Sequence, residues 1–98
     1  MTDYAALVQA DRRLTILKLL EQSDDYSANE YLLQSALGGF GHNCSSDTVR
    51  AELAWLAEQG LAHLDETGGV DVARLTRRGH DAASGRARVP GVKRPRPE

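Results

Sequence analysis

Eight basic side chains are gathered in the last third of this 98-residue chain, where guanidinium and ammonium groups could bind the phosphates of a nucleic acid. They are Arg74, Arg77, Arg78, Arg86, Arg88, Lys93, Arg94 and Arg96. Residues 67–98 have a formal charge of +5, whereas residues 1–66 carry four basic and eleven acidic side chains, a charge of −7. This separation predicts that the C-terminal end meets a polyanion or an acidic partner. The alternative is a solvated tail that only aids solubility.

The other reactive side chains are too few or too scattered to build a catalytic or metal site. His42 and Cys44 are close in sequence, but zinc needs about three or four ligands, and only His63, His80 and scattered carboxylates could complete the set. We interpret Cys44 as a side chain packed against Val49. No Ser/His/Asp set or carboxylate pair has a spacing that indicates an active site. The sequence therefore predicts a protein that is not an enzyme and holds no metal or cofactor.

The first predicted helix runs from Thr2 to Gln22, with Thr2 as its N-cap. Its apolar residues recur at helical spacing and cover nearly all of its second half. They are Leu7, Ala10, Leu14, Ile16, Leu17, Leu19 and Leu20. Such a helix is either central to the fold or shared with a second subunit. We predict a homodimer that buries Leu7, Ile16 and Leu19 or their neighbours over more than about 1,000 Å².

Two further helices are indicated by their start and stop signals. Residues 27–30 match a capping box with Ser27 as N-cap, with Tyr26 and Tyr31 in the hydrophobic-staple positions. This helix is expected to end at Gly38 and Gly39. The glycine-rich loop after it lacks the preceding strand and the lysine of a P-loop, so we interpret it as a linker with Phe40 buried in the core.

The third helix is predicted over residues 45–59, with Ser45 as N-cap and Gly60 as its stop. Val49, Leu53 and Leu56 form its inward face. Trp55 lies off this face, and two interpretations stay open for it. It is either a partly buried core residue or an interface anchor.

The periodicity changes to that of strands after Gly60. Residues 61–65 and 70–75 flank a glycine turn and predict a β-hairpin. Thr76 is expected to cap a fourth helix that runs from Arg77 to about Gly85. Residues 86–98 contain three prolines and five basic side chains, so we expect an extended or disordered tail after a domain of residues 1–85.

This order of elements is that of a winged helix-turn-helix, a mainly α fold with a small β-hairpin. The third helix would be the recognition helix and the hairpin at residues 61–75 the wing. One motif resembles the recognition helix of regulators of the arsenical-repressor and multiple-antibiotic-resistance types: Ser45, Thr48, Val49, Leu53, Leu56, Gly60 and Leu61. Leu75, Thr76 and Gly79 resemble the strand-to-helix exit that follows the wing in these proteins.

The C-terminal segment restricts the resemblance to a smaller family. Residues 75–79 together with 85–95 are similar to the end of a family of small winged-helix proteins of Mu-like phages and prophages, and the likeness extends over most of the chain. The resemblance implies a phage context. It does not fix a role, since winged helices also bind proteins.

A DNA-binding winged helix would place residues 45–59 in the major groove and hold phosphates with its wing and tail. Ser45, Ser46, Thr48 and Arg50 are the candidate contacts on the helix, with Arg50 able to pair with guanine. At the end of the wing, the candidate DNA contacts are Arg74, Arg77 and Arg78. In the tail, the candidate phosphate contacts are Arg86, Arg88, Lys93, Arg94 and Arg96. Asp47, Glu52 and Glu58 are expected to repel phosphate beside them.

The sequence thus predicts a phage or prophage transcriptional regulator that binds double-stranded DNA and works in the cytoplasm of the bacterial host. The single cysteine indicates a reducing compartment, and neither a membrane span nor a secretory signal is expected. The alternative is a phage assembly or packaging module that uses the winged helix to bind another phage protein. The acidic second and third helices favour this alternative.

Overall fold

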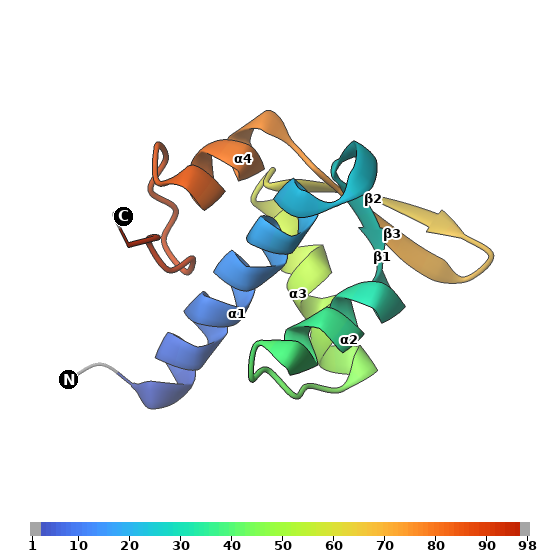
Figure 1. Ribbon diagram of the computed structural model, residues 1–98, viewed down its shortest axis with the longest axis horizontal. Helices are drawn as coiled ribbons and strands as arrows, with labels where there is room; N and C mark the ends of the chain where they lie inside the picture. The colour runs from blue at the N-terminus through green and yellow to red at the C-terminus, as the bar shows by residue number, and fades with distance from the viewer. Residues whose placement is uncertain (1–2, 97–98) are drawn as a thin grey trace.

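The computed structural model describes residues 3–96, which form four helices and a small antiparallel sheet whose hairpin projects beyond the helices (Figure 1). The helices are α1 (Tyr4–Gln22), α2 (Glu30–Gly39), α3 (Ser46–Glu58) and α4 (Arg77–Ser84), with a short 3-10 turn η1 (Asp24–Tyr26) after α1. The strands are β1 (Ser27–Asn29), β2 (Ala62–Thr67) and β3 (Val70–Leu75), in the sheet order β1-β3-β2. This part of the chain is mainly α with a small β-hairpin, as predicted. None of its helices is long and apolar enough to cross a membrane.

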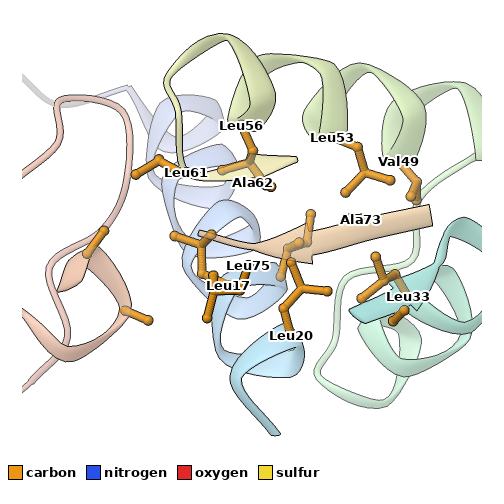
Figure 2. Packing of buried hydrophobic residues seen from close by; sticks show 14 of the residues in the cluster. Leu17, Leu20, Leu33, Val49, Leu53, Leu56, Leu61, Ala62, Ala73 and Leu75 are labelled. Atoms are coloured by element: carbon orange, nitrogen blue, oxygen red, sulfur yellow. The ribbon is translucent and has the colours of Figure 1, made fainter. Parts of the chain in front are cut away.

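The core lies where α1, α3 and the sheet meet (Figure 2). Leu53 of α3 and Leu20 of α1 approach Ala73 of β3 from opposite sides. Val49, Leu53 and Leu56 are at most 1% exposed, which confirms the inward face predicted for the third helix. Burying each such side chain contributes about 1.5 to 3 kcal/mol, so these leucines fix the orientation of α3.

Helix α1 is central to the monomer, and this corrects part of the predicted dimer interface. Ile16 is 0% exposed and belongs to the core cluster, so its assignment to a subunit interface is wrong. The apolar surface of α1 is covered by α2, α4 and the sheet, which all pack against it. Leu19 is partly buried against the same core, whereas Leu7 is 53% exposed. Asp3 caps the helix by accepting from the Ala5 amide at 3.1 Å, and the predicted cap Thr2 lies outside the described residues.

The start of α2 differs from the predicted capping box. Ser27 lies in β1, which pairs with β3, and Asn29 is the N-cap that accepts from the Leu32 amide at 2.8 Å. Glu30 does not reach back to Ser27, because its Oε2 accepts from the Asp71 amide at 2.6 Å. Strand pairing therefore outweighs the local capping signal. Tyr26 and Tyr31, the predicted staple, are both more than half exposed.

The loop after α2 also differs from the prediction. Phe40 is 63% exposed and is not part of the core. The core position at this end of α2 is taken by Leu37, which is fully buried. The ring of Phe40 instead lines a surface pocket beside α1.

The third helix, the hairpin and the fourth helix agree with the prediction. Ser45 caps α3 by accepting from the Thr48 amide at 3.1 Å. Gly68 and Gly69 form the hairpin turn with φ of 59° and 80°, a left-handed conformation that favours glycine. Thr76 caps α4 by accepting from the Gly79 amide at 3.0 Å. The two strands of the hairpin pair antiparallel, from Ala62 with Leu75 to Thr67 with Val70.

The basic C-terminal segment is where the structure departs most from the sequence-based expectation. Residues 86–96, here called the strap, form no helix or strand, but they pack on the body instead of being disordered. Val89 is buried in the core cluster, and the Lys93 amide donates to the Ala10 carbonyl of α1 at 3.1 Å. The expectation of a loose tail rested on charge and proline content, and it missed these two anchors.

Candidate nucleic-acid interface

The most exposed side of α3 carries no basic side chain. Asp47, Ala51, Ala54 and Glu58 are all exposed and are spaced by four, three and four residues, so they form one line on the helix, here called the outward stripe. Two carboxylates and two methyl groups offer a nucleic acid no hydrogen-bond donor. Carboxylates in this position repel phosphates. The helix predicted to read bases therefore presents an unfavourable face to DNA.

Arg50, the predicted base contact, lies beside the outward stripe and is held by the protein itself. Its Nε lies 3.3 Å from Oε1 of Glu30 and 3.6 Å from Oδ2 of Asp71. Its Nη2 donates to the Gly69 carbonyl at 3.3 Å. These contacts join α3 to α2 and to the hairpin turn. An external anion that binds Arg50 would compete with these two carboxylates.

The hydroxyl groups at the start of α3 also have partners within the protein. Ser45 is the helix cap, and its hydroxyl also donates to Oγ1 of Thr48 at 3.1 Å. Ser46 donates to Oε1 of Gln34 on α2 at 3.1 Å. The structure therefore brings Ser45, Ser46, Thr48 and Arg50 onto the same helix as predicted, but it gives each of them a structural contact.

Glu52 does not lie on the surface that DNA would approach. Its side chain is 4% exposed and turned toward α1, where Oε1 accepts from Nε of Arg13 at 3.0 Å and Oε2 lies 3.4 Å from Nε of Arg12. Arg12, Arg13 and Glu52 are here called the Arg–Glu cluster. The expectation that Glu52 repels a passing phosphate is wrong, because the residue is buried and paired.

The Arg–Glu cluster also anchors the strap, a role that the sequence analysis missed. The Arg13 guanidinium lies 3.7 Å from the centre of the Trp55 ring, and its Nη1 donates to the Gly91 carbonyl at 3.1 Å. Gly91 has a φ of +95°, and a Cβ there would lie 2.8 Å from Nη1 of Arg13. Trp55 is thus a partly buried packing residue, the first of its two interpretations. The position of Arg13 on the apolar side of α1 was the signal available in the sequence.

The predicted phosphate-binding side chains lie mainly at one end of the molecule. In Figure 1 the strap lies toward the left and the hairpin tip lies at the right, with α4 above α1 between them. The exposed basic residues without an ion pair among residues 3–96 are Arg77, Arg78, Arg86, Arg88, Arg94 and Arg96. Arg74 and Lys93 are exposed but lie 3.6 Å from Asp25 and 3.2 Å from Asp11.

The hairpin tip has the opposite charge. Asp65 and Glu66 are exposed, and Asp71 faces Glu66 across the strands. Like charges directly opposite one another in a sheet are unfavourable, and Arg50 lies close enough to Asp71 to offset part of this repulsion. The folded molecule therefore has a basic surface at the strap end and an acidic surface at the hairpin end. Its charges are separated in space, as they are along the sequence.

His42 and Cys44 do not combine with other ligands. Among residues 3–96, no group of three or more His, Cys, Asp or Glu side chains is arranged to hold a metal ion. Nε2 of His42 lies 2.7 Å from Oδ2 of Asp11, and the Cys44 thiol donates to the His42 carbonyl at 3.7 Å. Cys44 also packs against the core cluster that contains Val49.

Asp11 gives the strap contact a dependence on pH. Partial burial raises the pKa of Asp11, but hydrogen bonds from His42 and Lys93 outweigh burial and hold that pKa below its usual value of 3.8. A carboxylate with a lowered folded pKa contributes stability that is present above the unfolded pKa and is lost as pH falls through the folded pKa. We therefore expect Asp11→Asn to destabilise the protein at pH 6 and to have a smaller effect at about pH 3. Urea unfolding at both pH values measures this, and equal effects would contradict it.

Comparison with known proteins gives relatives in sequence and neighbours in fold. The chain is 50% identical over 91 residues to protein gp26 of Escherichia phage Mu, covering 93% of this chain and 94% of gp26. It is 36% identical over 93 residues to a protein of Haemophilus influenzae strain KW20/Rd, covering 89% of this chain and 90% of that protein. No family model matches.

Solved structures of the protein named h. salinarum RosR resemble this fold. The structure grown from NaBr has a TM-score of 0.64 and 19% identity, covering 74% of this chain and 64% of RosR. This chain therefore spans slightly less than two thirds of that protein. The complex structure hsRosR-S4 has a TM-score of 0.62 and 18% identity, covering 78% of this chain and 70% of RosR. At these identities the likeness shows a shared fold alone.

Proposed function

Because the chain belongs to the family of protein gp26 of Escherichia phage Mu, we propose that it is a phage or prophage winged helix-turn-helix protein that binds double-stranded DNA as a transcriptional regulator. The arrangement of α1, α2, α3, hairpin and α4 supports the winged-helix assignment. The fold shared with RosR agrees with it. The fold itself is compatible with other functions, so the DNA proposal depends on the surface.

The observation that carries the DNA proposal is the fixed position of the basic side chains. The docked strap holds its arginines against the body through Val89, Gly91 and Lys93 instead of leaving them on a loose tail. Positive charge fixed on a folded surface binds the phosphate backbone without losing the entropy of a disordered segment. Phosphate contacts at this end would supply most of the affinity. Base reading by α3 would be weak, since Arg50 is paired with Glu30 and Asp71.

The strap arginines provide a test of this binding mode. We expect a variant with Arg86, Arg88, Arg94 and Arg96 all replaced by serine to keep its fold, because all four side chains are exposed. The slope of log K against log salt should fall by about 0.9 for each of them that contacts a phosphate, hence by about two to three units for two or three contacts. Fluorescence anisotropy with a random duplex over a salt series measures the slope. The control Lys18→Ser should leave the slope unchanged, and an unchanged slope in the quadruple variant would contradict the mode.

We also propose that the protein acts as a homodimer through the N-terminal half of α1. Tyr4, Leu7 and Phe40 are large, exposed side chains that line one pocket between α1 and the loop after α2. Leu7→Asp should convert a dimer into a monomer at tens of micromolar, because it places a charge in the apolar contact. Sedimentation velocity measures this. Tyr31→Ser, an exposed position on α2 outside this pocket, should stay dimeric, and a wild-type monomer would contradict the proposal.

The outward stripe of α3 favours a second candidate function, a phage assembly or packaging module that binds another phage protein. Asp47 and Glu58 flank two exposed alanines, and the hairpin tip adds Asp65 and Glu66. Small apolar and acidic side chains suit a basic protein surface better than a phosphate backbone. This candidate predicts that Asp47→Lys weakens partner binding, whereas the DNA candidate predicts that it strengthens DNA binding.

A further inference from the structure

The pocket between α1 and the loop before α3 has chemistry that the proposed DNA surface does not use. It has a volume of about 110 Å³ and is lined by Val8, Arg12, Gly41, His42, Asn43 and Cys44. Since a water molecule occupies about 30 Å³, the pocket has room for a small oxyanion. Most of its lining residues are polar, which distinguishes it from the apolar pocket beside Tyr4 and Leu7.

Arg12 brings a nearly buried guanidinium group to this pocket. Its side chain is 14% exposed, and Nε lies 3.4 Å from Oε2 of Glu52. Within residues 3–96, neither of these two buried atoms makes a hydrogen bond, so the ion pair has poor geometry. Glu52 directs its good hydrogen bond to Arg13 instead, at 3.0 Å. Arg12 is therefore a nearly buried cation whose Nε has a carboxylate beside it but no hydrogen bond within residues 3–96, a costly arrangement that an anion beside the guanidinium would offset.

The charges around the pocket do not balance. Glu52 is shared between Arg12 and Arg13, and Asp11 between Lys93 and His42. Among the arginine, lysine, aspartate and glutamate side chains, three basic and two acidic groups leave an excess of one positive charge. Electrostatic attraction is stronger at such a partly buried position than in bulk water. An anion is the ligand that would offset this charge.

The pocket is built before any ligand arrives. The His42 amide donates to the Leu37 carbonyl at 2.9 Å, and Nε2 of Gln34 donates to the Cys44 carbonyl at 3.0 Å. These bonds tie the loop to α2, so the wall opposite Arg12 is fixed. Binding would cost little ordering of the chain.

We propose that this pocket binds a phosphate group through the Arg12 guanidinium. A planar guanidinium donates two parallel hydrogen bonds to phosphate oxygens, which lysine cannot do. The phosphate source follows from the proposed function, on which this part of the inference rests: a backbone phosphate of DNA that reaches α1 beside the start of α3. A free phosphate group would present the same chemistry.

Inorganic phosphate is the first probe, with thermal unfolding of the full chain in phosphate or chloride at equal ionic strength. At a phosphate concentration tenfold above Kd, we expect the wild-type midpoint to rise by about 5 to 10 °C. Phosphate also stabilises proteins in general by exclusion from their surface, so the comparison is between variants. Lys18→Gln should show the same phosphate-dependent rise of the midpoint as the wild type. Arg12→Gln should lose the part of that rise that saturates with phosphate concentration. Equal saturable rises in Arg12→Gln and the wild type would overturn the proposal.

A second measurement does not depend on a variant that folds. In amide NMR spectra of the wild type, phosphate should shift the signals of Gly41, Asn43 and Cys44 in a saturable way. Saturable shifts confined to other residues would overturn the proposal. DNA then identifies the source: Arg12→Gln should lower the salt slope by about 0.9 if a backbone phosphate is bound. If Arg12→Gln loses phosphate binding but keeps the wild-type salt slope for DNA, the pocket binds a free phosphate group. If the wild type does not bind DNA at all, the proposed function is overturned, whereas phosphate binding in the pocket is not.

Discussion

Replacing Glu52 by alanine is expected to lower the free energy of unfolding by about 3 to 5 kcal/mol. Glu52 is 3% exposed and is the only carboxylate that the described residues place against both Arg12 and Arg13. Without it, two guanidinium groups would stay in a nearly buried site with no counter-charge. Breaking a buried ion pair by removing one partner costs far more than the pair itself contributes.

Urea denaturation measures this effect, and α3 provides a matched control. Glu58 is an exposed carboxylate on the same helix, so Glu58→Ala should change stability by no more than about 0.5 kcal/mol. If Glu52→Ala lowers the free energy of unfolding as little as Glu58→Ala does, the Arg–Glu cluster does not stabilise the strap side of the fold. The Trp55 fluorescence of the folded variant would also change, because Arg13 lies over its ring.

Replacing Gly79 by alanine is expected to destabilise the protein by about 3 kcal/mol, at the upper end of the cost of overpacking. A Cβ at Gly79 would lie 2.0 Å from the Leu61 carbonyl oxygen and 2.7 Å from Cδ1 of Leu75. The first of these atoms is backbone and cannot rotate away. Helix α4 would have to move off the sheet, and the Thr76 cap would move with it.

The control for this change is Gly39→Ala, another helical glycine. A Cβ at Gly39 would meet no atom within 4 Å, so this variant should be neutral or slightly stabilised by the better helix propensity of alanine. Thermal melts of the two variants give the comparison. Equal midpoints would show that α4 does not pack against Leu61 as closely as the structure has it.

The elements that sequence reasoning located correctly are those specified by local signals. Ser45 and Thr76 are caps whose side chains bond to an amide three residues later, and Gly68 and Gly69 supply the left-handed turn of the hairpin. Each signal acts within a few residues, and at these positions no long-range pairing overrode it. The periodicity of Val49, Leu53 and Leu56 is similarly local, and it fixed the buried face of α3.

The features that sequence reasoning missed depend on contacts between distant residues. Ser27 matched the pattern of a helix cap, but it lies in β1, which pairs with β3. Its partner in that pairing, Arg74, is 47 residues away in the sequence. The strap was expected to be loose because its composition is basic and rich in proline. Its docking depends on Arg13, 78 residues before Gly91. Composition cannot report a contact of that kind.

The candidate site was predictable in its residue types but not in its electrostatics. The charge count correctly separated an acidic body from a basic C-terminal third. It could not show that Arg50 faces Glu30 and Asp71, nor that Glu52 is hidden from the surface. Because of these pairings, the proposed base reading by α3 is weak, and the proposed affinity depends on phosphate contacts at the strap end.

Binding of the full-length protein to a random DNA duplex in a low-salt buffer tests the central claim most directly. Phosphate attraction is strongest at low salt, so a basic surface fixed by the strap should bind any duplex there. We predict saturable binding whose affinity falls linearly with the logarithm of the salt concentration. Absence of binding at the lowest salt tested would contradict the DNA proposal and would leave the outward stripe of α3 as the functional surface, with a basic phage protein as its partner.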